Sequence, residues 1–372
     1  MSLVDVLLPT TTVGSYAVPG WLQATREMIR RGEFGRLDVR EVLDDAVMAA
    51  ITDQERAGLD ILSDGEERRH DFIMGFYERI HGFRPMERPR KIGVEFYDTE
   101  VVYEAIDRIA APAGLGIVEE FLFARTRTTR PLKVPVPGPL TLTTPTRRGP
   151  AYKTEETYVA DLARIVHTEL QRLAEAGATF IQIDEPAFHP WFTQNIKGVV
   201  QLFNEAVRGV KAKIALHICF GNRAGRPRSR RSYVPFFPAV LEARAEQFVL
   251  EFANREMAEI DLWARFGVDR ELGAGLIDQK SFYLETPEDV AGRIRMALKH
   301  VPPEKLYINP DCGMNYTPRW LAFRKLKAMV DGTQIVRGEL GGGRTIEGQA
   351  TPGSRGGGSG RARGARSARL RR

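Results

Sequence analysis

Cysteine is scarce in this chain of 372 residues, which contains only Cys219 and Cys312. Two cysteines cannot build the disulfide framework that stabilises many small secreted proteins. Long apolar runs are also missing, because no stretch approaches the roughly 18 consecutive apolar residues of a membrane span. The first residues, "MSLVDVLLPTTT", lack the basic start, apolar segment and cleavage site of a secretory signal. We therefore expect a cytoplasmic protein that does not enter a membrane.

Excess positive charge is confined to the end of the chain. The formal net charge is +6, but residues 341–372 hold eight arginines and one acid, Glu347, so the rest of the chain is close to neutral. This tail is rich in glycine, serine and arginine and has few apolar residues to bury, so we expect it to be disordered. It could touch nucleic acid or other polyanions non-specifically. A solvated appendage is the simpler interpretation.

Before the tail, apolar runs alternate with amphipathic stretches, and residues 1–340 are expected to form one catalytic domain. The pattern predicts helices over residues 154–177, 286–301 and 317–332, the last one closing at Gly332. Continuous apolar strands that alternate with helices indicate a parallel sheet covered on both faces. We count eight runs, which favours a TIM-type (β/α)8 barrel. They are "TTTVGS", "GLDILSDGE", "LKVPVPGPLTL", "TFIQIDEPA", "KIALHICFG", "QFVLEFANRE", "ELGAGLID" and "KLYINPDCG".

Each run ends in reactive or tightly turning residues, and the strands of a barrel all end at the face where active sites are built. The ends are Ser15, Asp64-Gly65-Glu66, Pro137-Gly138-Pro139, Asp184-Glu185-Pro186, His217 and Cys219, Glu251, Asp278, and Asp311-Cys312-Gly313. Residues from about 70 to 130 are too many for a simple connection. We interpret them as an insertion over the barrel mouth, with two helical segments, "RHDFIMGFYERIHGF" and "VVYEAIDRIAAPAGLGIVEEFLFA", and a hairpin between them.

The stretch "ALHICFGN" places His217 and Cys219 two residues apart, so in a strand both side chains lie on the same face. Zinc accepts imidazole nitrogen and thiolate sulfur in tetrahedral sites. Taken alone, the pair is more typical of a buried histidine beside a small apolar cysteine. Cys312, at the end of the eighth run, changes this interpretation, because a closed barrel would bring both cysteines of a cysteine-poor chain to one mouth.

A fourth candidate ligand is Glu251, which lies between Leu250 and Phe252 at the end of the sixth run. A carboxylate at such an apolar position needs a partner. Zinc is one candidate, and a buried ion pair with an arginine such as Arg255 is the other. Because a carboxylate is a comparatively weak ligand that can move aside, an incoming thiol could bind the zinc and become a strong nucleophile. Alkylation of sulfur is the natural reaction of such a site.

Together these motifs resemble the catalytic C-terminal barrel of the cobalamin-independent methionine synthase family. The resemblance covers most of residues 8–340 and includes "SDGEERRHD", "PGPLTL", "IQIDEPA", "HICFGN", "VLEFANRE", "GAGLID" and "NPDCGM". It implies a zinc site made of His217, Cys219, Glu251 and Cys312. It also implies transfer of a methyl group to the sulfur of homocysteine, which makes methionine.

By the same resemblance, Ser15, Glu66 and Asp184 would hold the amino acid, and the two acids suit its ammonium group. Ser15 could instead cap the following helix, and Glu66 could be one of several solvated charges. His189 and Asp278, also near strand ends, are candidates for protonating the leaving group, although a structural role is the alternative for each.

The identity of the methyl donor stays open, because residues 90–130 lack the segment that the family uses for folate. Methyltetrahydrofolate and a methyl-corrinoid protein are both candidates. Another thiol acceptor, such as coenzyme M, is an alternative within the same chemistry, but its sulfonate would require cations where this chain has Glu66 and Asp184. Two other classes remain open: a nucleic-acid-binding protein that acts through the tail, and a porphyrin decarboxylase, which needs no thiolate ligands.

Overall fold

The computed structural model describes residues 3–69, 73–87, 101–188, 195–222, 227 and 230–341. A parallel sheet of six strands forms its centre, in the order β3-β5-β6-β7-β8-β9. These strands are β3 (Val134–Pro137), β5 (Phe180–Asp184), β6 (Lys213–Ile218), β7 (Gln247–Glu251), β8 (Glu271–Ile277) and β9 (Leu306–Pro310). Strands β3, β5, β7 and β9 are buried along their whole length, as expected for a parallel sheet covered on both faces.

Two shorter segments close the sheet into a ring. Parallel bridges join Thr10 to Ile308 of β9, Thr11 to Ile61, and Leu62 to Leu132 just before β3. The eight predicted runs therefore take consecutive places around a closed barrel, which confirms the predicted fold class. The first two runs form isolated bridges rather than full strands.

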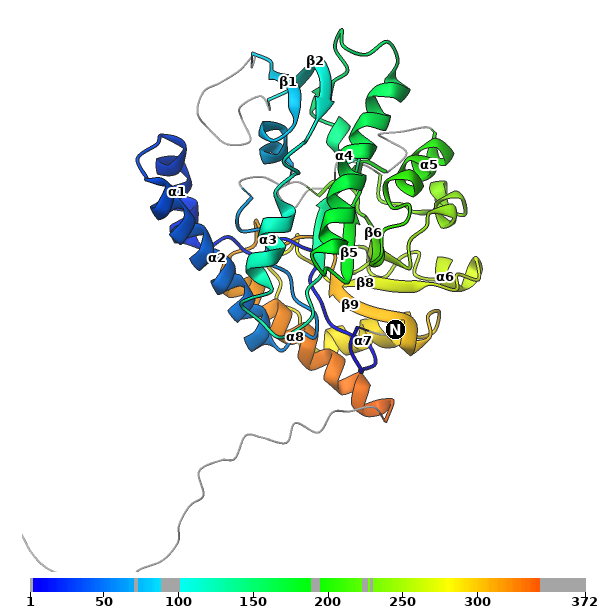
Figure 1. Ribbon diagram of the computed structural model, residues 1–372. Coiled ribbons are helices and arrows are strands. Elements are labelled where there is room, and N and C mark those ends of the chain that lie inside the picture. Colours follow the sequence, from blue (N-terminus) through cyan, green and yellow to red (C-terminus); the bar gives the residue numbers. More distant parts are fainter. Residues whose placement is uncertain are drawn as a thin grey trace, which may run out of the picture.

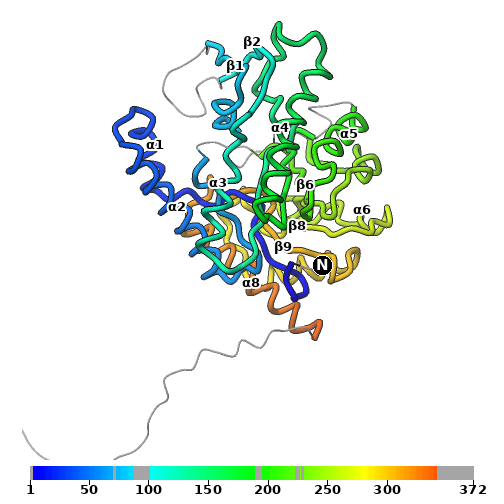
Figure 2. The backbone as a smooth tube through the Cα atoms, viewed as in Figure 1, coloured from blue at the N-terminus to red at the C-terminus, as the bar shows by residue number. Residues whose placement is uncertain are grey.

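Side chains at this seam supply part of the hydrogen bonding that a longer strand ladder would provide. The backbone N–H and the hydroxyl of Thr10 donate to Asp60 over 2.9 and 2.8 Å. Arg337, near the end of the last helix, donates to the carbonyl oxygens of Leu7 and Leu8 and to Asp60. Figure 2 shows the dark-blue start of the chain lying beside β9 and the last helix. The seam thus joins the first residues to the last helix.

Helices surround the strands (Figure 1). They are α1 (Gly20–Arg30), α2 (Arg36–Ala57), α3 (Ile117–Ala124), α4 (Glu155–Glu175), α5 (Ile196–Ala206), α6 (Leu262–Arg265), α7 (Pro287–Ala297) and α8 (Arg319–Glu339). Side-chain hydrogen bonds at the N-cap explain where two of the predicted helices begin. The Thr154 side chain accepts a hydrogen bond from the Thr157 backbone N–H at the start of α4. Thr286 and Asp289 form a reciprocal capping box at the start of α7.

The predicted end of the last helix at Gly332 is wrong, because α8 continues to Glu339. Gly332 is instead a point of close contact with α7. A Cβ atom at Gly332 would lie 2.5 Å from the Pro287 carbonyl oxygen and 2.7 Å from the Cβ of Val290. The glycine is therefore needed for helix packing and does not end the helix.

We expect Gly332→Ala to destabilise the protein by about 1–3 kcal/mol, since the added methyl group must push α7 and α8 apart. Gly338→Ala is the matched control in the same helix, because nothing lies within 4 Å of a Cβ atom there. The control should be neutral or up to about 1 kcal/mol more stable, because alanine favours helix. Urea unfolding of the two variants measures the difference, and equal stabilities would contradict the packing argument.

The insertion contains less helix than predicted. β1 (His81–Pro85) pairs in antiparallel fashion with β2 (Tyr103–Ala110), and a short 3-10 turn (Met74–Glu78) precedes them. The prediction of helix over the "VVYEAIDRIA" part of the second segment is wrong, whereas its "IVEEFLFA" part forms α3. Tyr103 stacks on Tyr77, with ring centroids 4.8 Å apart, and such aromatic packing favours a strand over an isolated helix. β4 (Thr146–Arg147) extends this small sheet by a parallel pair with β2.

The hairpin predicted between the two helical segments falls mostly on residues 88–100, which lie outside the described residues. The antiparallel pair of β1 and β2 consists mainly of residues that were predicted to be helical, and Figure 1 shows this pair at one end of the barrel. The division into residues 1–340 and a separate tail stays a prediction, because residues 342–372 lie outside the described residues. Within the described ranges, no helix is both long and apolar enough to cross a membrane.

Candidate metal centre

The period of two along the strands sets which side chains face the inside of the barrel. Phe180, Ala215 and Val249 belong to a small apolar cluster, separate from the large core between strands and helices. Residues an even number of positions further along the same strands share that face. The inner face of β5, β6 and β7 therefore ends in three polar side chains, Asp184, His217 and Glu251.

Three side chains of types that can bind a metal meet at this end of the barrel. One ligand atom from each of His217, Cys219 and Cys312 lies within 4.8 Å of the other two. His217 and Cys219 are buried, and Cys312 is half-buried. Both cysteines are free thiols. The predicted meeting of the two cysteines across the mouth is thus present in the structure, and imidazole with two sulfurs is a donor set that suits zinc.

His217 is oriented by the neighbouring strand. Its Nδ1 atom donates to Asp184 Oδ1 over 2.7 Å, and that oxygen also accepts from Gln182 Nε2 over 2.7 Å. The other ring nitrogen, Nε2, is buried and has no hydrogen-bond partner in the described part of the chain. Metal-binding histidines commonly donate their second N–H to a carboxylate in this way. The histidine therefore presents one unpartnered nitrogen toward its neighbours.

Without a metal, His217 and Cys312 both keep a proton at neutral pH. Burial lowers the pKa of His217, but its hydrogen bond to Asp184 and the nearby charges of Asp184 and Cys312 outweigh burial and raise this pKa to about 9. The hydrogen bond that the Cys312 thiol donates toward Cys219, burial, and the charge of Cys219 raise the pKa of the Cys312 thiol well above its ordinary value. Two thiolates side by side at these positions are thus unfavourable unless a cation compensates them. A divalent ion would replace these protons.

Glu251 lies outside the group of three. Its Oε2 atom accepts hydrogen bonds from Lys280 Nζ over 3.1 Å and from Asn222 Nδ2. Glu251 does form a buried ion pair, but Arg255 is not the partner, because Arg255 pairs with Glu259 over 2.6 Å. Glu251 as a zinc ligand stays a prediction.

Ser15 lies beside Cys312, the third member of this group. A Cβ atom at Gly313 would come within 2.0 Å of Ser15 Oγ, and the Met314 backbone N–H donates to the Ser15 carbonyl over 2.9 Å. These contacts hold Ser15 against the residues that follow Cys312. The capping alternative is wrong, because α1 begins at Gly20 after Pro19. Its predicted role in substrate binding stays a prediction.

Glu66 is buried, so the alternative of a solvated charge is wrong. It adopts a left-handed backbone conformation with φ of 56°, directly after Gly65 with φ of 74°. Such strain in a residue with a side chain persists only where the surroundings impose it, and it is common at functional sites. Burial raises the pKa of Glu66 to about 8; Arg69, 3.5 Å away, lowers it, and Asp184 raises it further.

Of the two candidate proton donors, the structure describes only Asp278. His189 lies outside the described residues. The Asp278 carboxylate accepts hydrogen bonds from Asn254 Nδ2 over 3.1 Å and from the Lys280 backbone N–H over 2.8 Å. These contacts favour the structural role for Asp278, which holds the loop after β8.

Comparison with known proteins decides the family. The family model for the catalytic domain of cobalamin-independent synthase matches residues 8–334. Methionine synthase from Saccharolobus solfataricus is 38% identical to this chain over 90% of the chain and 96% of the relative. The chain belongs to the cobalamin-independent methionine synthase family. The corresponding enzyme from Sulfurisphaera tokodaii is 35% identical over 90% of this chain and 94% of its own length.

Solved structures agree with this family assignment. The B12-independent methionine synthase from Shewanella sp. W3-18-1, in complex with selenomethionine, has a TM-score of 0.77 and 30% identity, and covers 90% of this chain and 99% of that one. A Listeria monocytogenes protein described as a vitamin-B12 independent methionine synthase has a TM-score of 0.64 at 21% identity and supports the fold alone. Membership of the methionine synthase family makes the chain a methyltransferase of methionine biosynthesis.

Two residues near the candidate ligands have roles that the sequence did not indicate. Asp311 accepts hydrogen bonds from the backbone N–H groups of residues 252, 253 and 254, over 2.9, 2.9 and 2.7 Å. It therefore ties the loop after Glu251 to the residue before Cys312, and its place in "NPDCG" was the available signal. Lys280, two residues past Asp278, offered no such signal, because its importance depends on its contact with Glu251.

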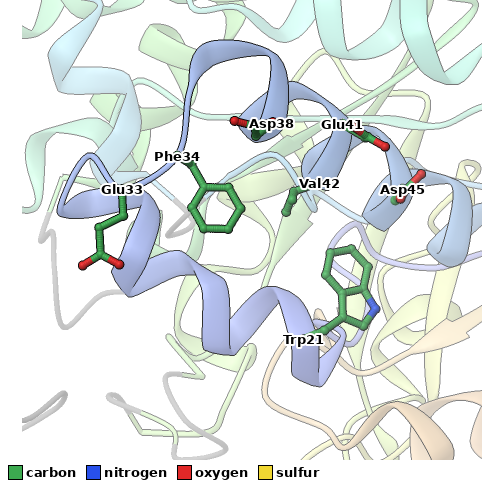
Figure 3. A pocket seen from close by; sticks show the side chains of 7 residues that line it. All are labelled: Trp21, Glu33, Phe34, Asp38, Glu41, Val42 and Asp45. Carbon is green, nitrogen blue, oxygen red and sulfur yellow. The ribbon is translucent and has the colours of Figure 1, made fainter.

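A surface pocket of about 410 Å³ lies away from these residues, between α1 and α2. Figure 3 shows its lining, which is Trp21, Glu33, Phe34, Asp38, Glu41, Val42 and Asp45. It contains carboxylates but no imidazole or thiol, and Glu33, Asp38 and Glu41 are exposed to solvent. This pocket therefore offers neither of the donor groups, imidazole and thiol, that meet at His217, Cys219 and Cys312.

Proposed function

We propose that this chain transfers a methyl group to the thiol of homocysteine and forms methionine, with zinc as its metal. The observation that carries the proposal is the meeting of His217, Cys219 and Cys312 within 4.8 Å at the end of the barrel. His217, Cys219, Cys312 and Glu251 would hold the ion. Bound zinc lowers the pKa of a thiol that reaches it, so the sulfur is available as thiolate at neutral pH.

In the proposed reaction a carbon–sulfur bond forms between the methyl group and the homocysteine sulfur. The bond from methyl to its donor breaks, and its electron pair stays with the donor. The thiol proton is lost before the transfer. This balance holds for methyltetrahydrofolate, whose leaving nitrogen takes up a proton, and for a methyl-corrinoid, whose cobalt keeps the electron pair. The selenomethionine in the Shewanella relative is an analogue of the proposed product.

The acids beside the metal centre support an amino acid as the acceptor. Glu66 and Asp184 are buried and close enough to raise the pKa of Glu66 through their like charges. A substrate ammonium group would relieve that repulsion and favour both carboxylates in their charged form. The sulfonate of coenzyme M would increase the repulsion, so the acids argue against that acceptor. Asp184 would serve both the ammonium group and His217.

The test combines zinc analysis of the purified protein with a homocysteine methylation assay. Methyltetrahydrofolate and methylcobalamin are offered as separate donors, and methionine is measured directly. We expect stoichiometric zinc and methionine formation with at least one donor, and loss of activity when a chelator removes the zinc. Methionine formation that continues at full rate in zinc-free protein would overturn the proposal.

A further inference from the structure

The Glu251 carboxylate is held by a buried cation next to the metal centre. Glu251 is 0% exposed, and the side chain of Lys280 is 5% exposed. Their charged atoms lie 3.1 Å apart, and Asn222 donates to the same oxygen, Oε2. In an ion pair so completely removed from water, the loss of one partner leaves the other as an uncompensated buried charge, which is strongly unfavourable.

The second oxygen of the same carboxylate is in the opposite situation. Oε1 of Glu251 is buried and has no hydrogen-bond partner among the residues that the structure describes. Buried carboxylate oxygens normally have partners. One oxygen of Glu251 therefore binds Lys280, and the other is available to bind a cation. The three other candidate ligands lie close to one another.

Charge explains why a cation is useful here. Zinc with two thiolates, one carboxylate and a neutral imidazole carries one net negative charge, and a substrate thiolate adds another. Lys280 interacts electrostatically with Glu251, Asp311 and Cys312, so it compensates several anions of the centre at once. If a substrate thiol replaced the carboxylate on the ion, the carboxylate would remain buried and would need this positive partner.

We propose that Lys280 is a positioning residue that competes with zinc for Glu251 and so keeps one position on the ion available to the substrate thiol. The inference rests on the proposed function. The loop holds Lys280 in place, because its backbone N–H donates to Asp278 over 2.8 Å and Asp278 accepts from Asn254. The contact that matters is between the Lys280 ammonium group and Glu251.

The test measures zinc affinity of the full chain by competition with a chromophoric chelator. Lys280→Met removes the charge but keeps the length of the side chain, so Glu251 loses its cation and turns to the ion. We expect zinc to bind about tenfold more tightly to this variant, a change of the size seen when groups behind metal ligands are replaced. Homocysteine should bind the zinc-loaded variant about tenfold more weakly, because the carboxylate is harder to displace.

Three controls separate this role from general effects. Lys280→Arg keeps the charge and should restore zinc affinity to within about twofold of wild type. Lys213→Met removes another largely buried lysine, which pairs with Glu271 at the opposite end of β6, and should leave zinc affinity unchanged. In a Glu251→Gln background, Lys280→Met should change zinc affinity by less than about twofold, because the two residues act through one contact.

The outcomes are distinct. Unchanged zinc affinity in Lys280→Met, or the same tenfold change in the Glu251→Gln background, would overturn the role of Lys280 while leaving zinc-dependent methylation intact. The expected affinity changes in a protein that does not methylate homocysteine would instead contradict the proposed function and keep the competition between Lys280 and zinc. A wild-type chain that binds no zinc would overturn both.

Discussion

Replacing Cys312 with serine is expected to remove most of the zinc and to abolish turnover. Zinc binding to four protein ligands contributes roughly 10–16 kcal/mol at neutral pH, so the loss of one strong ligand should weaken binding by about 3 kcal/mol, or roughly a hundredfold. Serine is similar in shape, but its hydroxyl does not ionise at neutral pH. The affinity for zinc, measured by chelator competition, and the rate of methionine formation should both fall.

The scarcity of cysteine provides a clean control for this experiment. Cys219 and Cys312 are the only thiols in the chain, so a thiol reagent reports on the metal centre alone. Zinc-loaded wild-type protein should react slowly at both sulfurs, whereas Cys312→Ser should expose Cys219 to the reagent. Circular dichroism establishes that the variant is folded. Full zinc content together with normal turnover in Cys312→Ser would show that this cysteine is not a ligand.

Asp184→Asn is expected to raise the KM for homocysteine by about tenfold or more and to lower kcat as well. The substitution removes a charge next to the expected ammonium group and weakens the hydrogen bond that orients His217. Changes behind a metal-binding histidine typically cost 10–100-fold in affinity or activity. Steady-state kinetics with varied homocysteine, alongside zinc analysis, measures both effects.

The two roles of Asp184 can be separated with a thiol that lacks the amino group, such as 4-mercaptobutanoate. The contact with the ammonium group predicts that wild-type protein prefers homocysteine strongly and that Asp184→Asn loses most of this preference. The role through His217 predicts an equal loss of kcat for both thiols. If the variant keeps the wild-type preference for homocysteine, Asp184 does not bind the amino group.

Much of the candidate site could be predicted, because strand alternation and barrel closure determine where its residues lie. The alternation of strand residues puts His217 and Cys219 on one face, and barrel closure brings the end of the eighth run to the same mouth. Neither statement needs side-chain detail. The hydrogen bond between Asp184 and His217 could not be predicted, because it depends on the register of β5 against β6, which sequence does not specify.

The errors have physical reasons as well. Gly332 was interpreted as a helix end, because glycine often ends helices, but here tight packing against Pro287 and Val290 requires a residue without a side chain. The "VVYEAIDRIA" segment has a helix-compatible pattern, yet pairing with β1 makes it a strand. The cation that pairs with Glu251 was sought four residues away at Arg255, whereas it comes from Lys280 on the loop after the next strand. Such long-range contacts are not visible in local patterns.

The seam between Thr10 and Ile308 has a consequence for biosynthesis. The ring cannot close before the ribosome has made β9, and Arg337 fastens the start of the chain only after α8 has emerged. Cys312 is translated just after β9, so its sulfur becomes available in the same interval. Nascent chains stalled before residue 306 should therefore lack a closed ring, and acquisition of the metal should be among the last events of maturation.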